Sequence, residues 1–145
     1  VECHLGDDEE FLATYGDGLT YAPLDDLIDA FHRKGKQAML LSARPEFHAH
    51  IVKAGPSGVV AEVEEMSQSS IRINAGFFVF KPRVLDYFDE DCVLEREPLE
   101  ALAKDGQLAA YRHEGFWQPM DTYREFTMLN QIWAANEAPW KVWSE

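Results

Sequence analysis

Two aspartates stand in short turns framed by glycines and aromatic residues. Asp17 lies in the YGDG segment of residues 15–18, and Asp121 lies in the WQPMDT segment of residues 117–122. Glycines let a phosphate approach the backbone, and Mg²⁺ is usually held by one or two carboxylates together with substrate phosphates. The two turns therefore predict a magnesium site shared by Asp17 and Asp121.

Each of these features also has a plainer interpretation. Gly-Asp-Gly is ordinary turn chemistry, and Asp121 could serve only as a negative charge or a cap at the start of a helix. His48 and His50 alternate onto one strand face and could chelate a metal, but the sequence offers no third ligand beside them. The tryptophans are expected to be core and subunit-contact residues, and the charged run at residues 95–97 is expected to be a surface cluster.

Length, charge and cysteine content narrow the class of protein. The 145 residues, 46% of them apolar, suffice for one globular domain, and a formal net charge of −13 disfavours nucleic acid and anionic membranes as partners. Cys3 and Cys92 form no metal-binding spacing, and no apolar stretch is long enough to cross a bilayer. We therefore expect a soluble, cytoplasmic protein.

The apolar pattern in the first third of the chain predicts an α/β fold. Residues 10–15 are typical of a buried parallel strand, which delivers Asp17 to the carboxyl edge of a sheet. Apolar residues then recur at helical spacing between Pro23 and Gly35. Residues 37–43 predict a second buried strand, which completes a strand-helix-strand unit with a right-handed crossover.

The rest of the chain predicts further strands and helices in alternation. Residues 48–53 and 59–63 flank a Gly-Pro-Ser-Gly turn and so predict a hairpin with a mobile tip. The later elements are a strand at residues 71–81, a short helix opened by Pro82, a helix over Glu97–Lys104, a strand at residues 107–113, and a helix at residues 122–136 with Thr122 as its N-cap.

Six segments of the sequence are distinctive when they are taken together. They are residues 14–18 (TYGDG), 73–80 (INAGFFVF), 95–99 (EREPL), 102–108 (LAKDGQL), 113–122 (HEGFWQPMDT) and 138–143 (APWKVW). With these segments the chain resembles the C-terminal part of a glucose-1-phosphate cytidylyltransferase, of the sugar nucleotidyltransferase superfamily. The resemblance implies that residues 1–145 are one domain with a truncated, Rossmann-like mixed sheet flanked by helices.

The resemblance also implies a reaction and a set of site residues. Such enzymes join CTP and α-D-glucose 1-phosphate into CDP-glucose and pyrophosphate, for polysaccharide synthesis. Asp17 and Asp121 would then be the catalytic residues and the Mg²⁺ ligands, because a metal neutralises the charge on a transferring phosphate without a proton-transfer residue. The substrate-binding residues would be Tyr15, Gly16, Glu64, Asn74 and Gly76, although a structural hydrogen bond is an equally good interpretation of Asn74.

The sequence departs from the family pattern in two respects. The Gly-rich loop that holds a nucleotide triphosphate does not precede Asp17, so the chain is expected to start partway through the enzyme. The family's Glu-Lys-Pro word reads Glu64-Glu65-Met66, which puts an acid where a lysine would grip the sugar phosphate. At an effective dielectric of 20, like charges about 4 Å apart repel by about 4 kcal/mol, where the lysine would attract by a similar amount. That difference is large enough to abolish catalysis.

Two functions therefore stay open. The first is cytidylyl transfer, with the activity of the chain alone in question and a separate N-terminal nucleotidyltransferase chain as a candidate partner. The second is a non-catalytic interaction or regulatory subunit derived from the same family. In both cases we expect a homo-oligomer, because a truncated sheet exposes an unpaired strand edge and apolar faces.

Overall fold

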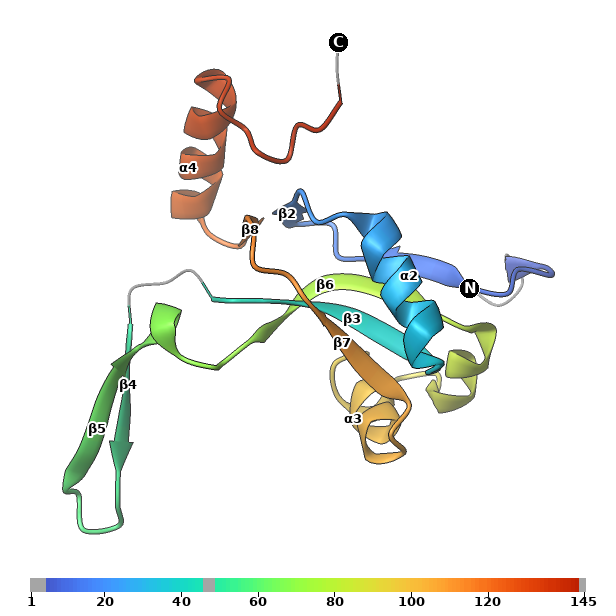
Figure 1. Ribbon diagram of the computed structural model, residues 1–145, viewed down its shortest axis with the longest axis horizontal. Helices are drawn as coiled ribbons and strands as arrows, with labels where there is room; N and C mark the ends of the chain where they lie inside the picture. The colour runs from blue at the N-terminus through green and yellow to red at the C-terminus, as the bar shows by residue number, and fades with distance from the viewer. Residues whose placement is uncertain (1–4, 46–48, 144–145) are drawn as a thin grey trace.

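A four-stranded mixed sheet forms the centre of the structure, a computed structural model that describes residues 5–45 and 49–143 (Figure 1). Its strand order is β1 (Phe11–Thr14), β6 (Ile73–Phe80), β3 (Ala38–Ala43) and β7 (Leu108–Arg112). Strand β6 is antiparallel to both β1 and β3, whereas β3 and β7 are parallel. The α/β class and the mixed sheet predicted from the sequence are confirmed.

The prediction of a buried parallel strand at residues 10–15 is wrong in two respects. Strand β1 pairs antiparallel with β6, and its residues alternate between half-buried and exposed, with Leu12 50% exposed. The strand-helix-strand unit does keep β1 and β3 parallel, since both are antiparallel to β6, which lies between them. An apolar run indicates burial but does not reveal which later segment will pair with it.

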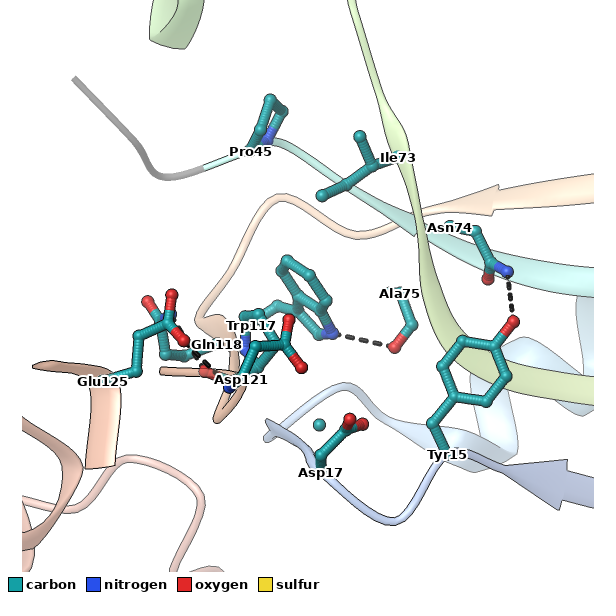
Figure 2. A pocket seen from close by; sticks show the side chains of 12 residues that line it. Tyr15, Asp17, Pro45, Ile73, Asn74, Ala75, Trp117, Gln118, Asp121 and Glu125 are labelled. Atoms are coloured by element: carbon teal, nitrogen blue, oxygen red, sulfur yellow. Dashed lines mark hydrogen bonds between the residues drawn. The ribbon is translucent and has the colours of Figure 1, made fainter. Parts of the chain in front are cut away.

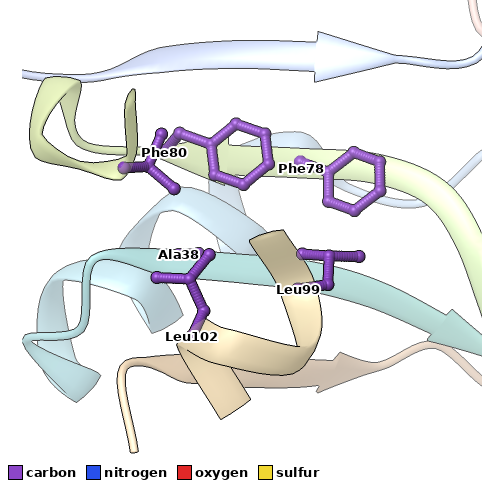
Figure 3. Packing of buried hydrophobic residues seen from close by; sticks show 6 residues of the cluster. Ala38, Phe78, Phe80, Leu99 and Leu102 are labelled. Atoms are coloured by element: carbon purple, nitrogen blue, oxygen red, sulfur yellow. The ribbon is translucent and has the colours of Figure 1, made fainter. Parts of the chain in front are cut away.

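Helices cover both faces of the sheet. Helix α2 (Leu24–Lys34) ends at Gly35 in the left-handed conformation, as its sequence predicts, and its Leu27 and Phe31 pack on Met39 and Val79. The opposite face carries α3 (Glu97–Lys104) and the 3₁₀ helix η2 (Pro82–Tyr87). Figure 3 shows that face, where Ala38, Phe78 and Phe80 of the strands lie against Leu99 and Leu102 of α3.

The predicted hairpin is also present, and it projects away from the sheet (Figure 1). It consists of β4 (His50–Ala54) and β5 (Val60–Glu65), paired antiparallel, and the 3₁₀ helix η1 (Met66–Gln68) follows it. His48 and Cys3 lie outside the described residues, and Cys92 is a free thiol. Within the described ranges, no helix has the length and apolarity needed to cross a membrane.

A second, two-stranded sheet was not predicted from the sequence. It pairs β2 (Gly18–Thr20) antiparallel with β8 (Trp117–Pro119) and leads into α4 (Tyr123–Ala134). Three-residue strands are too short to show a period of two, which explains why the pattern missed them. The predicted N-cap of α4 is confirmed, because the Thr122 side chain and Glu125 form a reciprocal capping box.

Candidate functional site

A cavity lies where the end of β1, the start of β6 and the β2–β8 pair meet (Figure 2). Its volume is about 500 Å³. Such a volume suits a small polar ligand. Twelve residues line it: Tyr15, Asp17, Gly18, Pro45, Ile73, Asn74, Ala75, Trp117, Gln118, Pro119, Asp121 and Glu125.

The two aspartates reach this cavity from distant parts of the sequence through the β2–β8 pairing. Gly18, directly after Asp17, pairs with Pro119, and the Met120 N–H donates a hydrogen bond to the Asp17 carbonyl oxygen at 2.9 Å. Figure 2 shows both carboxylates in the same cavity. Asp17 follows a strand of the main sheet, as predicted, but Asp121 follows a strand of the separate pair.

The electrostatic environment of Asp121 reflects this proximity. Its pKa is raised above the ordinary aspartate value, first by desolvation and then by the negative charges of Asp17 and Glu125. Like charges that share a site disfavour each other's ionised form, so a cation between them would relieve the repulsion. The carboxylate pair is therefore suited to binding a positively charged ligand.

The donor set favours one type of metal site over others. In the described part of the chain, no group of three or more His, Cys, Asp or Glu side chains is placed to hold a metal, and His50 is exposed on β4, outside the cavity lining. Structural zinc sites need four such ligands, whereas Mg²⁺ is commonly held by one or two carboxylates plus waters and phosphates. Asp17 and Asp121 thus fit Mg²⁺ that arrives with a phosphate.

Three of the predicted substrate-binding residues form one hydrogen-bonded group, of which Tyr15 and Asn74 line the cavity and Gly76 does not. The Asn74 Nδ2 group donates to the Tyr15 hydroxyl at 3.0 Å, and Asn74 Oδ1 accepts from the Gly76 N–H at 3.0 Å. Gly76 has a φ of 78°, and an added Cβ would lie 2.8 Å from Cγ of the Tyr15 ring. Only glycine allows this backbone shape and this approach.

Like Gly76, the other two predicted substrate-binding residues, Gly16 and Glu64, are not in the cavity lining. Gly16 lies in the turn between Tyr15 and Asp17. Glu64 lies on the projecting hairpin, where its carboxylate is 3.4 Å from Lys53 Nζ, and the structure does not bring it to the cavity. Glu65, in the position expected for the family's lysine, accepts a hydrogen bond from Gln68 at 3.2 Å and is also absent from the lining.

Sequence reasoning missed three polar residues of the lining. Trp117 is only 8% exposed, as expected for a core residue, but its Nε1–H also donates to the Ala75 carbonyl at the cavity wall at 2.8 Å. Gln118 lies beside it on β8. Glu125 accepts hydrogen bonds from the N–H groups of Asp121 and Thr122. The Thr-x-x-Glu spacing of a capping box was a usable signal for Glu125.

The cavity is acidic. Asp17, Asp121 and Glu125 line it, and none of the twelve lining residues in the described chain is Lys, Arg or His. The only charged side chains that a free phosphate dianion would meet in this lining are negative, so it would be repelled unless a cation came with it.

The chain is similar in sequence to known proteins. No family model matches the chain. A glucose-1-phosphate cytidylyltransferase from Salmonella typhimurium is 42% identical over 143 residues, which cover 97% of this chain and 55% of that protein. A Bacillus subtilis protein that provisionally carries the same name is 41% identical over 140 residues, covering 94% of this chain and 54% of that one. The chain thus spans about half the length of the relatives that it matches.

The solved structures agree on the fold. A crystal structure from Bacillus anthracis, provisionally assigned as a glucose-1-phosphate thymidylyltransferase, matches 99% of this chain and 60% of its own chain with a TM-score of 0.66. The sequence identity is 16%, so this likeness shows the fold alone. The resemblance deduced from the six sequence segments is confirmed.

Proposed function

Since this chain corresponds to the C-terminal part of a glucose-1-phosphate cytidylyltransferase, we propose that its cavity holds the sugar phosphate during cytidylyl transfer from CTP to glucose 1-phosphate. The observation that carries the proposal is the meeting of two carboxylates, Asp17 and Asp121, with the Tyr15–Asn74 group in one cavity. CTP, CDP-glucose and pyrophosphate belong to the activity of a whole enzyme, of which this chain spans about half the length.

The two carboxylates and the Tyr15–Asn74 group have complementary tasks in this proposal. Asp17 and Asp121 hold Mg²⁺, which neutralises the negative charge that the sugar phosphate and the nucleotide bring together. The pKa of Asp121 is raised first by desolvation and then by the charge of Asp17, and a cation bound to both carboxylates would relieve that repulsion. The acidic lining also sets the order of binding. The cation binds before the phosphate or together with it, because a bare phosphate is disfavoured next to three carboxylates.

Asn74 supplies the polar contacts for the sugar. An amide side chain has two N–H donors and an oxygen with two lone pairs. One donor is used by the Tyr15 hydroxyl and one lone pair by the Gly76 N–H, so a donor and an acceptor remain for a sugar hydroxyl. The structural role and the binding role of Asn74 are therefore compatible.

A regulatory or interaction subunit is the second candidate function, and Glu65 favours it. An acid at this position removes the phosphate-binding lysine, and no basic residue of the described cavity lining replaces it. A cytoplasmic location, a homo-oligomer and a separate chain that supplies a nucleotide-binding half are further parts of our proposal. They are supported by the polar, acidic composition and by the exposed apolar side chains described below.

Isothermal titration of the chain with glucose 1-phosphate, with and without Mg²⁺, tests the proposal. We expect binding to be at least about tenfold tighter with Mg²⁺, because the cation removes the repulsion between phosphate and carboxylates. Asp17→Asn with Asp121→Asn should abolish this Mg²⁺ dependence. Asp29→Asn, which neutralises an exposed carboxylate on α2, is the matched control and should leave it unchanged. Absence of binding, or binding that ignores both Mg²⁺ and the double substitution, would refute the proposal.

A further inference from the structure

Glu95 lies outside the cavity lining but is joined to it through one hydroxyl group. The Tyr15 hydroxyl donates a hydrogen bond to Glu95 Oε1 and accepts one from Asn74 Nδ2. We propose that Glu95 is a positioning residue: it orients the Tyr15 hydroxyl and thereby fixes the Asn74 amide for sugar recognition. The sugar-recognition part rests on the function proposed above, whereas the orienting role stands on the geometry alone.

The number of available protons fixes the direction of both hydrogen bonds at the Tyr15 hydroxyl. A phenol has a single hydrogen to donate, and Glu95, when ionised, can only accept. With that hydrogen directed to Glu95, the Tyr15 oxygen must accept its second bond, and only the NH₂ end of Asn74 can donate it. The hydroxyl of Tyr15 therefore selects one of the two orientations of the amide.

The hydrogen bond at the oxygen end of the Asn74 amide favours the same orientation. Asn74 Oδ1 accepts from the Gly76 N–H at 3.0 Å, a bond that the reversed amide would replace by two facing donors. With both ends fixed, the Asn74 amide keeps a single orientation, and Figure 2 shows it directed at the Tyr15 hydroxyl. An amide so fixed presents a donor and an acceptor together, the pattern that a sugar hydroxyl needs.

The groups that make this chain of contacts are themselves firmly held. The turn before α3 is closed by hydrogen bonds from the Arg96 N–H to Val93 O at 2.9 Å and from the Leu99 N–H to Leu94 O at 3.1 Å. The Tyr15 ring packs edge-on against Phe78, with the ring centres 5.5 Å apart. Site residues supported in this way by fixed neighbours keep a productive geometry.

A purely structural role for Glu95 does not explain its contact with Tyr15 as well as a positioning role does. The Glu95 side chain belongs to an exposed residue, and its removal should cost little folding stability. The sequence itself suggested only a surface charge cluster at residues 95–97. Within that cluster, Glu97 instead accepts from the Val93 N–H at 3.1 Å, so the two acids have different tasks.

The test uses the full chain with Glu95→Leu, which removes the acceptor, and Glu95→Gln, which retains one. Glu100→Leu, an exposed position of α3, is the matched control. The first measurement is the NMR signal of the Asn74 side-chain amide, assigned by its loss in Asn74→Ala. The second is the affinity for glucose 1-phosphate with Mg²⁺, and thermal unfolding checks that each variant is folded.

We expect Glu95→Leu to move the Asn74 amide signals further than Glu100→Leu does, and to weaken sugar-phosphate binding about fivefold. Glu95→Gln should restore most of both. Amide signals in Glu95→Leu that match the control would overturn the proposal, whatever the affinity. If the unmodified chain binds no sugar phosphate, the proposed function fails, and the amide signals alone still decide whether Glu95 orients Asn74.

Discussion

The backbone N–H of Met120 donates a hydrogen bond to the carbonyl oxygen of Asp17 at 2.9 Å. This bond closes the end of the β2–β8 pair, so Asp121, the next residue, is held beside Asp17 by the main chain. The backbone thus imposes a proximity that the two side-chain charges oppose. Binding sites commonly keep such local strain because the ligand relieves it.

Asp121→Asn should stabilise the chain slightly near neutral pH. The pKa of Asp121 is raised in the folded protein, chiefly by desolvation and then by Asp17 and Glu125, so ionising it costs folding free energy. Below the ordinary value of 3.8 the carboxyl is protonated in both states, and its cost appears as the pH rises through the folded pKa. We expect the melting temperature at pH 7 to rise on the order of 1–2 °C. Thermal unfolding of both proteins from acid to neutral pH checks this, and a difference that grows toward acid pH would contradict it.

Gly76→Ala should destabilise the fold by about 2–3 kcal/mol, from a disfavoured positive φ and a clash with the Tyr15 ring. The glycine has a φ of 78°, and the new Cβ would lie 2.8 Å from Tyr15 Cγ. Urea unfolding measures the loss. Gly16→Ala is the control, since nothing lies within 4 Å of its added Cβ, and it should change stability by less than about 1 kcal/mol. Equal effects of the two substitutions would show that the Tyr15–Gly76 contact is not required.

Thr122→Ala should cost about 1 kcal/mol, because it removes half of the capping box that starts α4. The same box holds the Asp121 N–H against Glu125, so Mg²⁺ binding should weaken together with stability. Urea unfolding and Mg²⁺ titration measure the two effects. Thr127→Ala, within the same helix, removes a bond from a hydroxyl to the Tyr123 carbonyl and should be nearly neutral. A Thr122→Ala protein as stable as the Thr127→Ala protein would argue against the cap.

We expect the chain to self-associate or to bind a partner. Exposed apolar side chains are grouped on the hairpin, where Val52 pairs with Val63, and on α4 with the segment after it. Trp133 and Trp143 are 49% and 55% exposed, which fits the subunit contact expected from the sequence better than a core position. Large exposed apolar patches usually mark interaction surfaces. Sedimentation velocity at increasing concentration tests this, and a monomer that stays unchanged across the series would contradict it.

The chain by itself should not form CDP-glucose at a measurable rate. Its acidic cavity has no basic residue in the described lining, and Glu65 occupies the position of the expected lysine. Release of pyrophosphate from CTP and glucose 1-phosphate with Mg²⁺ is the measurement, and the double variant Asp17→Asn, Asp121→Asn is the background control. Turnover well above that control would show that other residues supply the missing positive charge.

Predictions that depend on residues close in the sequence are confirmed, whereas the prediction of strand pairing is wrong. The helix between Pro23 and Gly35, the cap at Thr122 and the glycine turn of the hairpin all follow from neighbours in the sequence, and all are confirmed. The antiparallel pairing of β1 follows from a segment far along the chain and was predicted incorrectly. Local patterns report burial and backbone conformation, whereas pairing depends on which distant strand is nearest after folding.

The residue types in the sequence, by themselves, determined the α/β class, the glycine-framed aspartates and the family to which the six segments point. Only the tertiary structure decided that β2 and β8 carry Asp17 and Asp121 into one cavity, and that Glu64 stays on the hairpin beside Lys53. It also decided that Glu95 reaches Tyr15, a contact between residues far apart in the chain. The physical reason is that hydrogen bonds and charges act over a few ångströms in space, and spacing along the chain does not reveal which groups will come that close.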